Sequence, residues 1–110
     1  MGAQTTVVFL GARIEIPENE VEELETKKHP TLIAARTYKL DHYWGEFGSG
    51  RSQFILLIGK RIALMGIEND LNKSIAFDEL EKEMKGVAQR LIAIGINDEP
   101  KLYIEFIPDI

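Results

Sequence analysis

Residues 52–68 read SQFILLIGKRIALMGIE, and this stretch decides the fold. Its apolar residues form two uninterrupted runs, 54–58 and 62–65, separated by Gly59-Lys60-Arg61. A short glycine-containing connection between two apolar runs is typical of a β-hairpin. A strand with one face in water would alternate apolar and polar residues, and these runs do not. The sequence therefore predicts a hairpin of two strands that are buried on both faces.

Strands are also expected towards both ends of the chain. Apolar residues occupy every second position from Thr6 to Ile16, and Leu102, Ile104 and Phe106 repeat the pattern near the C-terminus. Alternation with a period of two indicates β-strands, so the central hairpin should have a strand on either side of it in the sequence.

Two main helices are expected between the strands. The first follows a proline that favours a helix N-terminus, and it should be kinked or broken at Pro30. Beyond that point the segment Thr31 to Leu40 fits a second helical stretch or a strand, and its helix-forming residues favour the helix. The other helix runs from Asp78, which forms a capping-box-like pair with Glu81, to a C-terminal cap at Gly95.

Together these elements predict an α+β fold. At 110 residues the chain has room for one core, so a single domain of residues 1–110 is expected. It would hold a four- to five-stranded antiparallel or mixed sheet with two main helices on one face. The order strand, helix, hairpin, helix, strand resembles the βαββαβ arrangement of ferredoxin-like sandwiches as a topology, and a topology implies no function.

Two helices on one face cannot cover both faces of so apolar a sheet. We expect the second face to present Phe9, Ile55, Leu57, Ala63 and Met65, a contiguous patch near or above the size that monomers usually expose. Two covers are available, namely the segment 41–47 folded over its own sheet as an internal lid, or a second chain. The sequence favours a homodimer or another stable partner on the open face of the sheet.

Composition narrows the surroundings and the partners of the protein. Hydrophobic residues make up 45% of the chain and charged residues 28%, which is enough apolar mass for a folded core. The net charge of −5, without a cluster of lysines and arginines, argues against nucleic-acid binding. Cysteine is absent, and neither a membrane-spanning apolar run nor a signal-peptide pattern occurs. We therefore expect a cytoplasmic protein without membrane association.

The segment 41–51, DHYWGEFGSGR, holds the candidates for chemistry. Acid–base catalysis would use His42, Asp41 or Glu46, but in an extended strand His42 and Glu46 lie about 13 Å apart, too far for a hydrogen bond. Neither histidine of the chain belongs to a metal-binding motif, and the glycine spacing matches no phosphate-binding or dinucleotide-binding loop. We therefore expect no metal, no cofactor and no catalytic activity.

Recognition is the function that this segment favours. Tyr43, Trp44, Phe47 and Arg51 are of the residue types enriched among interface hot spots. With the acidic net charge, they predict a small non-catalytic protein-protein interaction module, for example an acidic inhibitor or immunity-type protein that binds a basic partner. The alternative is a small enzyme or ligand-binding protein with a pocket between the sheet and the 41–51 segment.

Overall fold

The computed structural model describes residues 5–46, 54–66 and 70–107, and it confirms the α+β class. Its elements are, in order, β1 (Thr5–Ile16), the 3-10 turn η1 (Glu18–Glu20), α1 (Val21–Glu25), α2 (Pro30–Thr37), β2 (Asp41–Glu46), β3 (Phe54–Gly66), α3 (Phe77–Ala93) and β4 (Lys101–Ile107). The four strands form one sheet in the order β2-β3-β1-β4, and every neighbouring pair is antiparallel. Each helical connection therefore joins two parallel strands that have an antiparallel strand between them, the split βαβ arrangement, twice over.

The hairpin predicted within residues 52–68 is wrong, because β3 runs straight through Gly59. The hairpin partner of β3 is β2 instead. Gly59 lies opposite Gly11 of β1, and a Cβ atom added to either glycine would lie 2.8 Å from the Cα atom of the other. It would also overlap the carbonyl oxygen of Leu10 or Ile58 on the facing strand. Gly59 thus permits a close approach of two strands, and it does not make a turn.

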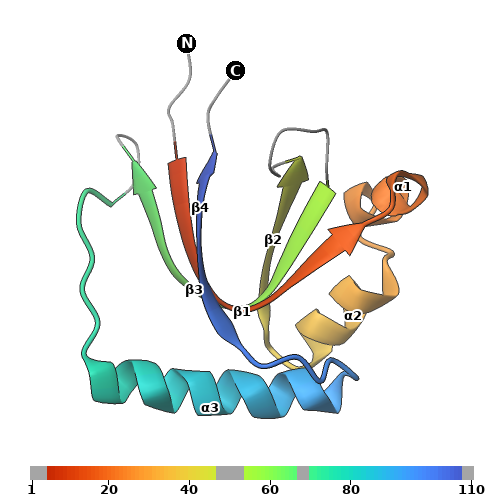
Figure 1. Cartoon of the computed structure of the whole chain (residues 1–110). Coiled ribbons are helices and arrows are strands. Elements are labelled where there is room, and N and C mark those ends of the chain that lie inside the picture. Colours follow the sequence, from red (N-terminus) through yellow and green to blue (C-terminus); the bar gives the residue numbers. More distant parts are fainter. Residues whose placement is uncertain (1–4, 47–53, 67–69, 108–110) are drawn as a thin grey trace.

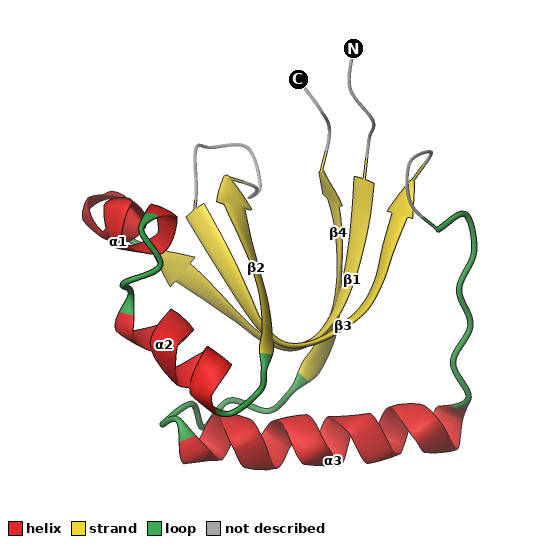
Figure 2. Ribbon diagram, turned by 180° about the vertical axis from the view of Figure 1, so that it is seen from behind, coloured by secondary structure: helices red, strands yellow, loops and turns green. Residues whose placement is uncertain are grey.

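The sheet bends sharply along β1 and β3, as Figure 1 shows, and the glycine pair lies near the middle of both strands. We call its two halves the β4 arm, in which β4 pairs with residues 5–11 of β1, and the β2 arm, in which β2 pairs with residues 54–59 of β3. The bend gives the sheet a concave face between the arms and an outer face around them (Figures 1 and 2).

The concave face is a closed core. Val7 and Phe9 from the β4 arm pack with Ile55 and Leu57 from the β2 arm, and none of the four has any exposed surface. The expected bare patch is therefore wrong for Phe9, Ile55 and Leu57, which are buried within one chain. No lid is needed either, since residues 41–46 form the edge strand β2.

A register shift explains why the predicted patch mixed two faces. Val8 of β1 is opposite Ala63, and Phe9 is opposite Arg61, so that Ile62 has no partner in the ladder. An extra residue of this kind is a β-bulge, and it exchanges the faces of every residue that follows. Ala63 and Met65 consequently lie on the outer face, away from the concave core.

All three α-helices pack on the outer face, as predicted for the helices as a group. Their buried residues, Leu24 of α1, Leu32 and Ala35 of α2, and Val87 and Leu91 of α3, form an outer core with Ala12, Ile16, Leu40, Leu56 and Ile58. Apart from the first half of α3, the helices cover the β2 arm and the bend. Among the described residues outside the sheet, the segment 70–76 and Leu80 at the start of α3 border the outer face of the β4 arm (Figure 2).

The predicted break at Pro30 is confirmed, and residues 30–37 are helical. His29 precedes the break and is the N-cap of α2. Its Nδ1 atom accepts a hydrogen bond from the Thr31 amide at 3.2 Å, and its Nε2 atom lies 2.8 Å from Oε1 of Glu20. Because Nδ1 is an acceptor, the ring proton is on Nε2 and is donated to Glu20. One buried side chain thereby connects η1 to α2.

Both ends of α3 can be compared with the prediction. The predicted capping box is wrong, because α3 begins at Phe77 with Ala76 as an N-cap that makes no side-chain hydrogen bond. Asp78 lies inside the first turn, where its carboxylate accepts from the Glu79 amide. The C-terminal cap is confirmed, since Gly95 has a φ of 90°, in the left-handed region that glycine adopts at helix ends.

Candidate interaction surface

The predicted binding aromatics lie on opposite faces of β2. Tyr43 is opposite Leu57 and packs against the concave core, whereas Trp44 is opposite Leu56 and packs against the outer core. Both are half-buried, so they stabilise two different cores and do not form one surface. The other two predicted binding residues, Phe47 and Arg51, lie outside the described residues.

Two of the three candidate acid–base residues, Asp41 and His42, line a shallow hollow of about 460 Å³ at the start of β2. Its lining consists of Arg36, Lys39, Leu40, Asp41, His42 and Arg61. An Asp41 carboxylate oxygen accepts a hydrogen bond from the Arg61 backbone amide at 3.0 Å. Glu46, the third candidate, is the last residue of β2, and its side chain is outside the described part of the structure.

The charge of this hollow is mainly positive. Within the described ranges, Arg36, Lys39 and Arg61 make no ion pair. Burial lowers the pKa of His42 below its usual value, the nearby Arg36 and Lys27 lower it further, and Asp41 opposes them. A neutral imidazole beside three cations is poorly placed to be a general acid. The three cations favour the binding of an anion in this hollow instead.

A different surface stands out on the outer face of the β4 arm. Leu102, Ile104 and Phe106 are 45%, 66% and 57% exposed. They are opposite Leu10, Val8 and Thr6 of β1, so alternation places all three on the outer face. We call these three residues the outer strip. It lies on an edge strand, because β4 has a neighbour on one side only.

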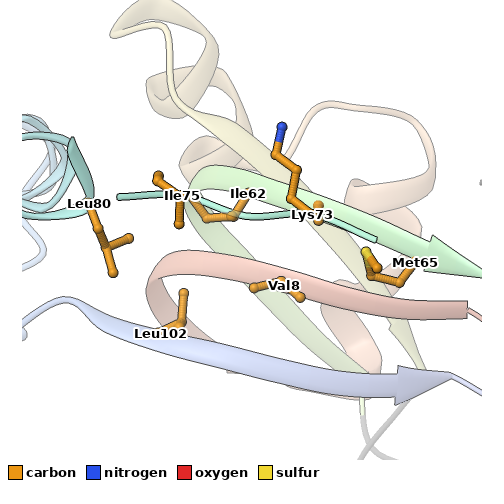
Figure 3. Close-up of a pocket in the computed structure, with 8 residues that line it drawn as sticks. Val8, Ile62, Met65, Lys73, Ile75, Leu80 and Leu102 are labelled. Atoms are coloured by element: carbon orange, nitrogen blue, oxygen red, sulfur yellow. The ribbon is translucent and has the colours of Figure 1, made fainter. Parts of the chain in front are cut away.

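An apolar hollow of about 200 Å³ adjoins the outer strip. Its lining comes from all the elements around the β4 arm, namely Val8, Ile62, Ala63, Met65, Lys73, Ile75, Leu80 and Leu102. Figure 3 shows Ile75 and Leu80 on one side and Val8 and Leu102 on the other, with the Lys73 ammonium pointing away from them. Leu102 belongs to both features, which makes strip and hollow one continuous surface.

This surface exists because of where the helices lie. The buried residues of α3, Val87 and Leu91, are in its second half and pack with the outer core, whereas Leu80 near its start only borders the hollow. The segment 70–76 runs beside the β4 arm without filling the space in front of it (Figures 2 and 3). The alternation of residues 102–106 was visible in the sequence, but nothing in it indicated that their outer face has no helix.

The edge strand β4 has protection at its start, in Pro100 and Lys101, but not along its outer face. Natural edges often carry charged side chains that discourage pairing with another strand. The outer strip has none: Lys101 stands at the first position of β4, before the strip, and the one acid, Glu105, lies on the concave side, where it pairs with Arg13 at 2.9 Å. The other edge strand, β2, begins with Asp41 and ends with Glu46.

The described residues offer no other obvious chemistry. Residues 5–46, 54–66 and 70–107 contain no group of three or more histidines and acids that could hold a metal ion. Within the same ranges no helix is both long enough and apolar enough to cross a membrane. Comparisons of the chain with protein-family models, with curated proteins and with solved structures gave no match.

Proposed function

We propose that this protein is a non-catalytic protein-protein interaction module whose contact surface is the outer strip with the adjoining hollow. The observation that carries this proposal is the exposure of Leu102, Ile104 and Phe106 together on one face of an edge strand. Contiguous apolar patches on soluble proteins mark interaction sites, and exposed sheet edges accept a further strand. The surface offers both properties at one place.

The size of the strip indicates what a partner must supply. Fully burying such a side chain contributes about 1.5–3 kcal/mol, so covering the exposed halves of three contributes roughly 4 kcal/mol. A dissociation constant of 1 μM corresponds to about 8 kcal/mol. The strip alone is therefore too small, and a stable partner must also use the backbone groups of β4 or fill the hollow.

The earlier choice of contact residues changes with this proposal. Tyr43 and Trp44 pack against two different cores, so the proposed surface does not use them, and their role in binding stays a prediction. Phe47 and Arg51 stay a prediction, and so does an inhibitor or immunity-type role. The net charge of −5 favours a basic partner through long-range attraction, whereas the strip would hold it by apolar contact.

Paired lysine substitutions test the proposal. Ile104→Lys places a charge in the middle of the outer strip. Ile33→Lys places a charge on α2, where Ile33 is 51% exposed. The α2 helix packs beside β2, at the opposite edge of the sheet from β4. The tagged chain should retain a protein in its own host as wild type and as Ile33→Lys, and lose it as Ile104→Lys. Circular dichroism would establish that both variants are folded. Retention of the same proteins by Ile104→Lys would contradict the proposal.

A second candidate function is the binding of a small anion in the hollow beside His42. The observation that favours it is the three cations, Arg36, Lys39 and Arg61, that line this hollow without an ion pair in the described part of the chain. This candidate keeps the ligand-binding alternative but moves it from a pocket under the 41–51 segment to the end of α2. Asp41 would hold the Arg61 backbone in place and take no part in acid–base chemistry.

Inorganic phosphate is the probe for this second candidate. A bound anion would offset the effect of Arg36 on His42, so the pKa of His42 measured by NMR should rise when phosphate is added. Arg61→Gln should weaken this response, and Arg90→Gln, on α3, should leave it unchanged. An unchanged His42 titration at millimolar phosphate would exclude the site.

A further inference from the structure

We infer that the partner of the outer strip is a second copy of this chain, joined along β4 so that two four-stranded sheets become one antiparallel sheet of eight. This inference rests on the proposed function, because it names the partner of the same surface. A two-fold symmetric interface brings the same patch of both copies together, so the patch must be complementary to itself. The outer strip meets this condition through the spacing of its three residues.

The register of such a pair follows from the sequence of β4. In an antiparallel pair, directly opposite residues share a face of the sheet. A two-fold axis at Ile104 therefore sets Ile104 against Ile104 of the second copy, and Leu102 against Phe106 of the second copy. All six apolar side chains then lie on one continuous outer face, and the whole of β4 is paired.

Neighbouring registers are less favourable. With the axis at Glu105, two carboxylates would be directly opposite each other, and like charges in that position are destabilising. With the axis at Tyr103, Phe106 would lie opposite Pro100, which precedes β4 and has no amide hydrogen to donate. An axis between two residues would set the apolar face of one copy beside the other face of its partner. The register at Ile104 avoids facing carboxylates, gives each residue of the strip an apolar partner, and keeps Pro100 outside the paired residues 101–107.

The hollow gives the second copy a place for a side chain. In the register at Ile104, Phe106 of the second copy lies opposite Leu102, at about 5 Å between Cβ atoms. Leu102 is part of the lining of the hollow, whose other apolar walls are shown in Figure 3. An apolar cavity of about 150 Å³ is enough to bind benzene, so a hollow of about 200 Å³ has room for a phenyl ring. The symmetry fills both hollows at once.

The same symmetry makes the contact strong enough to form. The two strips contact each other side by side across the new strand pair, Phe106 of each copy enters the hollow of the other, and the free amide and carbonyl groups of two edge strands bond to each other. The apolar contacts of the strip thus occur twice, the two Phe106 rings among them, and together with the backbone hydrogen bonds they offset the loss of freedom on association. A partner with an unrelated surface would have to provide each of these features separately.

The absence of cysteine makes a disulfide test of the register clean. Ile104→Cys faces itself across the axis and should form a disulfide-linked dimer quickly in oxidised glutathione, because opposite residues in a sheet have a spacing that a disulfide accepts. Leu102→Cys and Phe106→Cys should each crosslink slowly alone and quickly as an equal mixture. Ile33→Cys, on α2 and 51% exposed against 66% for Ile104, is the control and should crosslink slowly.

Light scattering of the wild-type chain tests the dimer without any variant. The mass should be twice 12.5 kDa, and Ile104→Lys should raise the dissociation constant at least 100-fold. A wild-type monomer at millimolar concentration overturns the inference, as does an Ile104→Cys variant that crosslinks no faster than Ile33→Cys. If the chain is monomeric while Ile104→Lys still abolishes retention of another protein, the proposed function stands and only the second copy is wrong. If Ile104→Lys changes neither the dissociation constant of the dimer nor the retention of another protein, the proposed function and the second copy are both wrong.

Discussion

Gly59→Ala is the substitution that tests the bend of the sheet most directly. The new Cβ atom would lie 2.8 Å from the Cα atom of Gly11 and would overlap the Leu10 carbonyl, so that the backbone of β1 must move. Gly59 also has a φ of 152°, which non-glycine residues rarely adopt. Backbone strain of this kind costs about 1–3 kcal/mol, and forcing extra volume into a packed site about another 1–3 kcal/mol. We expect a loss of about 4 kcal/mol in the free energy of unfolding, a large part of the 5–15 kcal/mol typical of a domain.

Two other glycines separate the effect of the contact from the effect of the backbone. Gly95→Ala has a φ of 90° but no atom within 4 Å of the new Cβ atom, so it should cost only about 1–2 kcal/mol. Gly86→Ala lies within α3 in open space and should stabilise the protein by about 0.5–1 kcal/mol. Urea unfolding followed by the fluorescence of Trp44, the only tryptophan, measures all three. A Gly59→Ala variant within about 1 kcal/mol of Gly95→Ala would refute the view that strand contact at this glycine pair shapes the sheet.

Two further predictions concern charged groups. Glu105→Gln should cost about 0.5–1 kcal/mol in the urea assay, because its ion pair with Arg13 joins the two arms but is 23–28% exposed. A double-mutant cycle with Arg13→Gln that shows no coupling would contradict that role. For His42, whose pKa is lowered by burial and by Arg36, the unfolded chain binds protons more readily than the folded one. The free energy of unfolding should therefore fall as the pH drops below about 6.5. The same measurement on His42→Gln should show a smaller fall. A free energy of unfolding that rises as the pH drops would contradict the lowered pKa of His42.

The parts of the fold that were predictable are those with local signals. The alternation of β1 and β4, the stripe of α3 and the break at Pro30 each depend on residues close together in the sequence. Gly59 was misinterpreted because glycine is favoured both in turns and where two backbones approach closely. What distinguishes the two cases is Gly11, which lies opposite Gly59 on another strand. The residues near Gly59 in the sequence carry no information about that pairing.

The candidate site was predictable in kind but not in place. The sequence indicated that the sheet carries more apolar surface than its helices cover, and an exposed apolar sheet face exists in the outer strip. Its location depends on the bulge opposite Val8, which moves Ala63 and Met65 to the outer face, and on the bend, which closes the concave one. Neither feature has a signal of its own in the sequence. The apolar surface that the helices leave uncovered was therefore assigned to the wrong face of the sheet.

The bend itself explains why an exposed surface is left on the outside. A flat sheet of this topology would present one continuous face for the helices to cover, and its other face would need a partner. Bending at Gly11 and Gly59 lets the concave face bury itself, but it also divides the outer face between two arms. The α1 and α2 helices cover the β2 arm, and α3, at 1.5 Å per residue about 25 Å long, lies along the bend. Because none of the described helices packs over the outer strip, the exposed apolar surface lies there, beside an edge strand that can pair with another strand.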